Sequence, residues 1–158
     1  ATSLKSEERN LILFGANLEE KVIIGVIVAL IFGVIVLYAI TRKAPRFDSQ
    51  RPKRMQSFET GLPVEETFNA AVHFAQQSAH KITEVDEANR YLTFAESASW
   101  PQSPGFWYSV YLREQDNGNT LVEVGITPKL PQFGSPAEKA MQVKLQACLS
   151  ALQASGNT

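Results

Sequence analysis

The sequence predicts a single transmembrane α-helix followed by a small α+β domain, in which a curved antiparallel sheet carries helices on one face. One uninterrupted apolar run near the N-terminus indicates the membrane helix. Two stretches with apolar residues at helical spacing, separated by short alternating runs, indicate the domain. The 158 residues divide into a polar segment (1–21), a transmembrane helix (22–41), a basic linker (42–54), an α+β domain (55–154) and a frayed tail (155–158).

The apolar run covers residues 22–40 and reads VIIGVIVALIFGVIVLYAI, without a charge, Pro, Asn or Gln. At 1.5 Å per residue, a helix of this length spans about 28 Å, close to the thickness of the hydrocarbon layer. A core helix of a small soluble protein would usually show a polar stripe, whereas this run is apolar all round. About twenty mostly polar residues precede it, so we expect a retained anchor rather than a cleaved signal peptide.

Basic residues flank the run unequally. Lys5, Arg9 and Lys21 precede it, and six basic residues follow it. The positive-inside rule therefore favours a cytoplasmic, stromal or matrix-facing C-terminal side, in a bacterial inner membrane or an organellar membrane such as the thylakoid. We also expect the six following residues to contact anionic lipid headgroups; they are Arg42, Lys43, Arg46, Arg51, Lys53 and Arg54.

Small residues recur at a spacing of four within the apolar run. Gly25, Ala29 and Gly33 lie on one helix face, where small side chains let two backbones approach closely. The face predicts a packing neighbour, which is either a second copy of the chain or a subunit of a larger complex. Apart from Tyr38 near its end, the run holds no ionisable residue, which argues against a proton relay or an ion path.

The segments on either side of the run are less informative. Apolar residues of segment 4–20 share one side of a helix, which suits the membrane surface, a protein partner or a partly ordered tail; they are Leu4, Leu11, Phe14 and Leu18. Residues 41–54 hold six basic residues and two prolines, a composition typical of an extended linker.

The domain begins with a short strand over residues 55–60 and a helix over residues 63–80. Pro63 suits the first helical position, and Glu65 and Glu66 suit the positive end of the helix dipole. A buried stripe at helical spacing follows from Val64, Phe68, Ala71, Val72, Ala75 and Ala79.

Four strands are predicted next, over residues 81–86, 90–96, 106–114 and 120–126. Residues 86–89 are turn-like, and Asp-Asn-Gly-Asn at 116–119 is a strong hairpin signal. Alternation predicts an inward face made of Leu92, Phe94, Phe106, Tyr108, Val110, Leu112, Val122, Val124 and Ile126.

The last helix begins near residue 135. Ser135 and Glu138 form the pattern of a capping box, with Pro136 at the first helical position. Its buried stripe consists of Met141, Leu145, Cys148, Leu149 and Leu152. The resulting order β-α-β-β-β-β-α is similar to that of TATA-binding-like and small helix-grip domains. This likeness of topology covers about two thirds of the chain, and fold by itself implies no function.

No residue pattern indicates a catalytic, metal or cofactor site. His73 and His80 lie about 10 Å apart along one helix, too far for one metal ion, and we expect them to face solvent. Cys148 lies on an apolar stripe and is expected to be a core residue. Residues 55–158 carry six basic and eleven acidic side chains, an excess that disfavours binding to nucleic acid phosphates.

The outer face of the predicted sheet offers a candidate surface for a protein partner. Aromatic and apolar residues gather on this face and in two Pro-containing loops, and exposed patches of this kind often mark interfaces. The alternative is that loops or the N-terminal segment cover these side chains, or that they pair across strands. The candidate partner-binding residues are Tyr91, Trp100, Trp107, Tyr111, Leu121 and Phe133.

Three functions are consistent with these features. The first is a non-catalytic accessory subunit or assembly factor of an integral membrane protein complex. The second is a membrane-tethered module that binds a lipid or another small apolar ligand, although bulky residues should fill so small a core. The third is a homo-oligomeric scaffold built through the small-residue face of the membrane helix.

The scaffold hypothesis makes a direct prediction. Replacing both Gly25 and Gly33 with Leu should abolish self-association, because the larger side chains keep two helix backbones apart. Analytical ultracentrifugation in detergent measures the association, and the circular dichroism spectrum should show that the domain stays folded. Oligomers that persist in the double variant would exclude this hypothesis.

Overall fold

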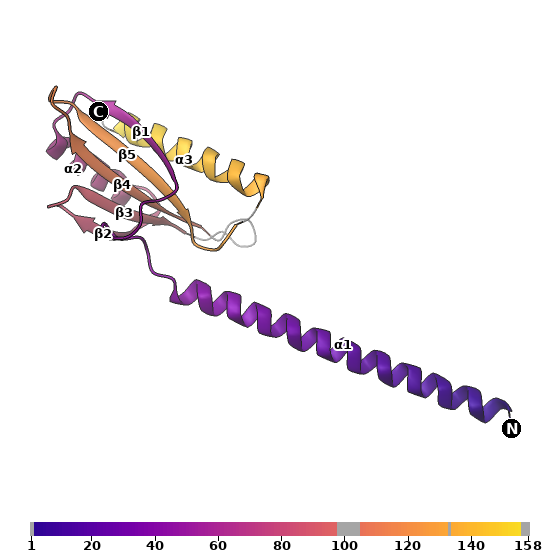
Figure 1. Cartoon of the computed structure of the whole chain (residues 1–158). Coiled ribbons are helices and arrows are strands. Elements are labelled where there is room, and N and C mark those ends of the chain that lie inside the picture. Colours follow the sequence, from indigo (N-terminus) through magenta and orange to yellow (C-terminus); the bar gives the residue numbers. More distant parts are fainter. Residues whose placement is uncertain (1, 98–104, 133, 156–158) are drawn as a thin grey trace. The chain divides into compact units, whose positions relative to one another are not determined.

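The computed structural model describes residues 2–97, 105–132 and 134–155, and their side chains except those of residues 2–18 and 40 (Figure 1). The chain forms two compact units, Ala1–Arg42 and Lys43–Thr158. The first unit is the helix α1 (Thr2–Thr41). The second unit is an α+β domain, which begins at Lys43 rather than at residue 55, because the basic segment expected to be a linker belongs to it.

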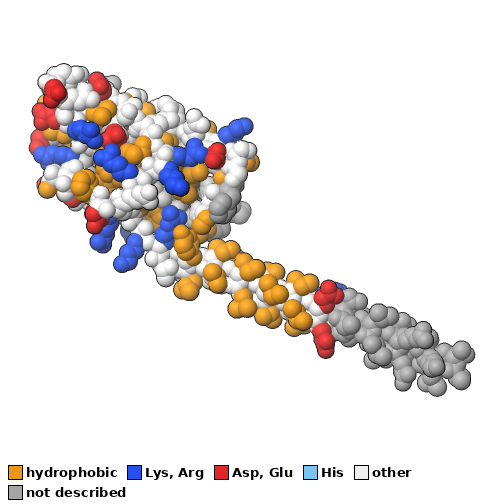
Figure 2. Space-filling view, in the orientation of Figure 1, with side chains coloured by type: hydrophobic (Ala, Val, Ile, Leu, Met, Phe, Trp, Pro, Cys, Tyr) orange, Lys and Arg blue, Asp and Glu red, His pale blue; other side chains and the backbone are white. Residues whose placement is uncertain are grey.

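Helix α1 contains a segment long and apolar enough to cross a membrane. This segment is Glu19–Ala39, with a mean hydropathy of 3.1, and none of its most apolar window is buried against the rest of the protein. Apolar side chains cover the visible surface of the helix after its acidic residues (Figure 2). The small-residue face is open as well, since a Cβ atom added at Gly25 or Gly33 would meet no heavy atom within 4 Å.

The domain is built on a five-stranded sheet in which every neighbouring pair is antiparallel. The strand order is β1-β5-β4-β3-β2, so the first strand pairs with the last one at an edge of the sheet. Two helices, α2 and α3, lie on one face of the sheet (Figure 1). The bounds are β1 (Arg54–Thr60), α2 (Val64–Gln77), β2 (His80–Asp86), β3 (Tyr91–Glu96), β4 (Phe106–Glu114), β5 (Thr120–Pro128) and α3 (Ser135–Ser155).

The hydrophobic core lies between the sheet and the two helices. All nine residues predicted to face inward from the strands are buried in it, as is the whole predicted stripe of α3, including Cys148. Helix α2 contributes Phe68, Ala71 and Ala75 to the core. The small side chains of the two alanines let the helix approach the sheet closely. The alternation and the helical spacing therefore identified the core, except at Ala79, which lies beyond the end of α2 at Gln77 and is exposed.

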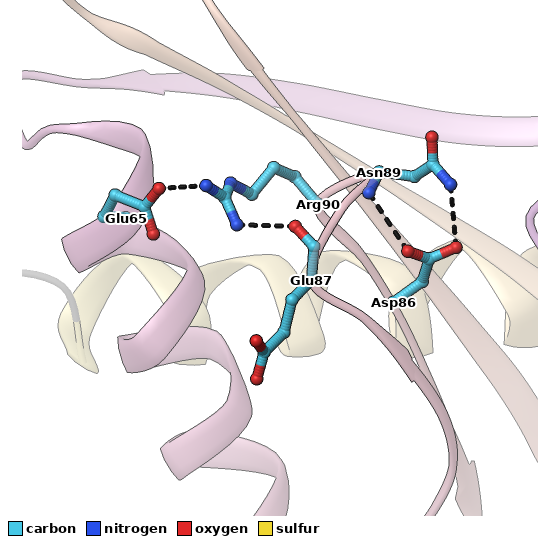
Figure 3. A network of polar contacts seen from close by, with 5 residues as sticks. All are labelled: Glu65, Asp86, Glu87, Asn89 and Arg90. Atoms are coloured by element: carbon cyan, nitrogen blue, oxygen red, sulfur yellow. Dashed lines mark hydrogen bonds and ion pairs between the residues drawn. The ribbon is translucent and has the colours of Figure 1, made fainter.

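The hairpin turn between β2 and β3 is held by polar contacts (Figure 3). The Asp86 carboxylate accepts hydrogen bonds from the backbone N–H of Asn89 at 3.0 Å and from its side-chain amide at 2.8 Å. Arg90 was expected in the strand, but it adopts a left-handed conformation with φ of 53°. From there its guanidinium pairs with Glu65 of α2, which ties the turn to the first turn of that helix.

Both helix starts differ slightly from the expected caps. Pro63 is the N-cap residue of α2 rather than its first helical residue. The helix also ends at Gln77, where the Ser78 hydroxyl donates to the Phe74 carbonyl at 2.8 Å. At α3, the Glu138 carboxylate lies 3.0 Å from a guanidinium nitrogen of Arg54 in β1. The capping-box pattern had predicted that this carboxylate reaches back toward Ser135.

Strand β2 contains an irregularity that the sequence did not predict. Its register against β3 shifts between Ile82, which pairs with Phe94, and Glu84, which pairs with Thr93. Such a bulge inserts one extra residue and turns the following side chains to the opposite face. Glu84 is consequently placed on the outer face of the sheet, the one away from α2 and α3.

The core predicts a large stability effect for Phe94. Its side chain is fully buried, and its ring is stacked on Tyr108 with the ring centroids 5.3 Å apart. Phe94→Ala should lower the free energy of unfolding of the domain by about 3–5 kcal/mol. Tryptophan fluorescence during urea unfolding of the full chain in detergent measures this change. Val143→Ala on the exposed side of α3 is the control and should change it by less than about 0.5 kcal/mol.

Candidate functional site

The outer face of the sheet is covered by residues 43–53, which we call the strap. The strap runs across the face opposite α2 and α3 before it enters β1 (Figure 1). Near its start, the Pro45 carbonyl accepts a hydrogen bond from the Tyr91 hydroxyl of β3 at 3.1 Å. Near its end, Pro52 packs so closely on Gly125 of β5 that a Cβ atom added there would lie 2.6 Å from the proline ring.

Aromatic contacts hold the middle of the strap. The Phe47 ring lies with its centroid 5.7 Å from that of Tyr91, in an edge-to-face arrangement. Its centroid lies 6.5 Å from that of Tyr111, and the two tyrosine rings are 4.9 Å apart. The three rings therefore form a small aromatic cluster that joins the strap to β3 and β4.

A charged group completes the cover. The Arg51 guanidinium lies 4.7 Å above the centroid of the Tyr111 ring, and one of its nitrogens is 3.2 Å from the Glu123 carboxylate. Half of the Arg51 side chain is exposed, so this pair contributes at most about 1 kcal/mol. Burial, and next the neighbouring Tyr91, raise the pKa of the Tyr111 hydroxyl to about 12, so this group is neutral at physiological pH.

The strap corrects the expectation of an exposed aromatic patch. Tyr91, Trp107 and Tyr111 expose only 0%, 7% and 4% of their surface, and Leu121 is half-buried. The reason is that chain segments distant in sequence cover this face, which alternation within one strand does not reveal. Trp100 and Phe133, the loop residues of the proposed patch, lie outside the described residues.

The strap also corrects the expectation of an extended linker, and two of the six cations expected at lipid headgroups have carboxylate partners within the domain. Arg51 pairs with Glu123, and Arg54 pairs with Glu138 as the first residue of β1. Arg42, in the first unit, lies 5.8 Å from the centroid of the Tyr38 ring. Phe47 and the prolines between the basic residues were the available signal, since a solvated linker has no need of an aromatic side chain.

A cavity lies where the strap begins. Its volume is about 310 Å³, and its walls come from residues 43–46 of the strap and from Thr83 and Glu84 of β2. Lys43 and Arg46 are exposed, and they bring two positive charges to the lining of the cavity. Among the described residues, the Oε2 atom of Glu84 is buried and makes no hydrogen bond.

A polar cluster occupies one end of the inner face. The Glu96 carboxylate pairs with Lys144 of α3 and accepts a hydrogen bond from the Tyr108 hydroxyl at 3.5 Å. Its backbone carbonyl accepts a hydrogen bond from Lys129 at 2.6 Å. Burial raises the pKa of the Tyr108 hydroxyl and lowers that of the Lys129 ammonium group.

One histidine differs from the expectation of a solvent-facing side chain. His80 is half-buried, with its ring centroid 5.0 Å from Phe94 and 5.8 Å from Tyr108. Its Nδ1 atom lies 2.5 Å from the Ser78 hydroxyl. Burial lowers the pKa of His80, which favours the neutral ring. His73 is exposed as expected.

Two further observations bear on chemistry. Among the described residues, no three His, Cys, Asp or Glu side chains are grouped so that they could hold a metal ion. Burial raises the pKa of the Cys148 thiol to about 12, so the nucleophilic thiolate is disfavoured there. A groove of about 320 Å³ also lies beside β1, lined by Phe58, Glu59, Thr60, Gly61, Thr67, Ala70, Ala71, Val122, Leu152 and Gln153.

Comparisons with known proteins identify no family. No family model and no curated protein matches the chain. The crystal structure of Ara h 8.0201 is similar over 66% of this chain and 97% of its own, with 17% identity and a TM-score of 0.48. The structure of a protein from Nitrosospira multiformis is similar over 65% of this chain and 94% of its own, with 15% identity and a TM-score of 0.49.

The close packing of Pro52 predicts the effect of Gly125→Ala. The new Cβ atom would lie 2.6 and 2.8 Å from two atoms of the rigid proline ring, so the strap has to move away from the sheet. Amide hydrogen exchange of the full chain in detergent should become about tenfold faster in residues 43–53, which corresponds to a loss of about 1.4 kcal/mol. Gly61→Ala is the control, because a Cβ atom there meets no heavy atom within 4 Å. Unchanged exchange in the strap would contradict this packing.

Proposed function

We propose that this chain is a non-catalytic, single-pass accessory subunit or assembly factor of a larger membrane protein complex. In this proposal α1 crosses the membrane, and the α+β domain docks on the partner from the cytoplasmic or stromal side. The observation that carries the proposal is the exposure of α1. Its apolar segment Glu19–Ala39 has no cover from the rest of the chain, and apolar side chains in that state gain about 1.5–3 kcal/mol each when they leave water.

The small-residue face adds support for a protein neighbour within the membrane. Gly25 and Gly33 have open space around them, so a second helix can approach the backbone there without displacing any part of this chain. The neighbour is a helix of the partner complex, or a second copy of the chain in the scaffold hypothesis.

The strap supports a docking role for the domain. Because the domain begins at Lys43 and its first hydrogen bond to the sheet is at Pro45, few residues after α1 remain to act as a flexible tether. A short tether restricts the positions that a domain can sample, and this reduces the entropy lost when it binds a partner in the same membrane.

The domain also leaves room for the ligand-binding hypothesis. Its strand order and the two helices on one face of the sheet support a similarity in topology to helix-grip or TATA-binding-like domains. The groove of about 320 Å³ beside β1 is at the lower end of the range for small-molecule pockets. Phe94 and Tyr108 fill the core behind the sheet, however, so we rank this hypothesis second.

The proposal predicts that the chain co-migrates with large integral membrane proteins. Membranes that contain the native chain are extracted in a gentle detergent, and the complexes are separated by native electrophoresis and identified by mass spectrometry. A band of fixed stoichiometry with larger membrane proteins is the expected result. Migration as a monomer or as a small homo-oligomer would contradict the stable-subunit form of the proposal.

A matched pair of cross-linking variants tests the helix face. A small diazirine amino acid at position 29 should cross-link to a membrane protein, because Ala29 belongs to the small-residue face. The same probe at position 31 is the control, since residues two apart point to nearly opposite sides of a helix, and Ile31 should react mainly with lipid. Equal protein cross-linking from both positions would exclude a specific packing face.

A further inference from the structure

We propose that the cavity at the start of the strap binds a phosphate ester that carries a primary ammonium group, such as the headgroup of an aminophospholipid. Lys43 and Arg46 would bind the phosphate, and Glu84 would accept a hydrogen bond from the ammonium group. If the ligand is a lipid headgroup, this inference rests on the proposed function, in which α1 anchors the chain in a membrane. The cavity lies wholly within the α+β domain.

The Glu84 carboxylate has one oxygen without a hydrogen-bond donor among the described residues. This atom, Oε2, is buried. A buried carboxylate oxygen without a donor is unfavourable, because the charge loses its hydration and gains nothing in return. Glu84 also lines the cavity of about 310 Å³, which leaves room for a ligand beside this carboxylate.

A bulge in β2 places Glu84 on the outer face of the sheet. The register shift between Ile82 and Glu84 turns this carboxylate to the outer face, opposite Thr93. With regular alternation, Glu84 would point to the side of Ile82, which packs against the core. Bulges are frequent next to binding sites because they re-aim a single side chain.

Two basic residues of the strap share the lining of the cavity with Glu84. They are Lys43 and Arg46, and both are exposed. Two cations and one carboxylate therefore line the same small cavity. These charges are complementary to a zwitterion that carries a phosphate and an ammonium group. Lys43 also follows the end of the apolar segment at Ala39 by only four residues, and a chain of this length reaches at most about 14 Å. Lipid phosphates are therefore within reach of this part of the chain when α1 is inserted.

The test compares two lipids whose headgroups carry either three N–H donors or three N-methyl groups on the same nitrogen. The full chain is reconstituted in nanodiscs with equal amounts of phosphatidylethanolamine and phosphatidylcholine, and native mass spectrometry counts the lipids retained. Choline has no N–H group for Glu84, so phosphatidylethanolamine should be retained about tenfold better. Glu84→Gln should remove this preference. Glu87→Gln, which makes the same change at an exposed residue of the turn after β2, should keep it.

Further variants separate the roles of the charges and the source of the ligand. Arg46→Gln should lower the retention of both lipids. Lys139→Gln is its control, because Lys139 is exposed on α3 and does not line the cavity. Soluble phosphoethanolamine is then added at millimolar concentration. Competition would identify a water-soluble ligand of the same chemistry, whereas no competition would identify the lipid headgroup.

The inference is wrong if the wild-type chain retains the two lipids equally, or if Glu84→Gln retains the wild-type preference. Tryptophan fluorescence of each variant confirms that the domain is folded before the lipids are counted. Failure of this test is distinguishable from failure of the proposed function, because the Glu84→Gln chain still carries α1 and should still co-migrate with the partner complex.

Discussion

The crossing of the sheet by the strap is the constraint on which the rest of the domain depends. Strand β1 pairs with β5 at one edge, whereas the strap begins beside β2 at the other edge. The chain therefore has to traverse four strand spacings, about 19 Å, before β1 begins. Eleven residues in an extended conformation cover this distance with length to spare. Because α2 and α3 cover the inner face, the strap crosses the outer face on its way to β1.

The crossing determines which surfaces remain available for recognition. It buries Tyr91 and Tyr111 under Phe47 and Arg51, so the aromatic face of the sheet serves the stability of the domain instead of a partner. Among the described residues, the surfaces that remain include the uncovered apolar helix α1, the groove beside β1 and the cavity at the start of the strap. The same crossing leaves few residues between the end of α1 at Thr41 and the start of the domain at Lys43.

Local patterns predicted the elements well, because local geometry imposes them. The strand β4 (Phe106–Glu114) and the hairpin turn that follows it occur where alternation and the Asn-Gly pair placed them. The fate of His80 was not predictable in this way. It continues the polar pattern of α2, yet the helix ends at Gln77 and His80 opens β2 beside Phe94. The bulge before Glu84 left one mark in the sequence, since Ile82 and Val85, which pair with Phe94 and Leu92, are three residues apart instead of two.

The sequence alone determined the apolar helix, the order of the elements and the residues of the core, because each of these follows from periodicity over neighbouring residues. Only the tertiary structure decided that the basic segment is a strap, that the aromatic face is covered and that Glu84 faces a cavity with Lys43 and Arg46. The physical reason is that these features join residues some 40 to 70 positions apart, such as Pro45 with Tyr91 and Arg51 with Glu123. Contacts of that range depend on how the strands pair, and no local pattern encodes the pairing.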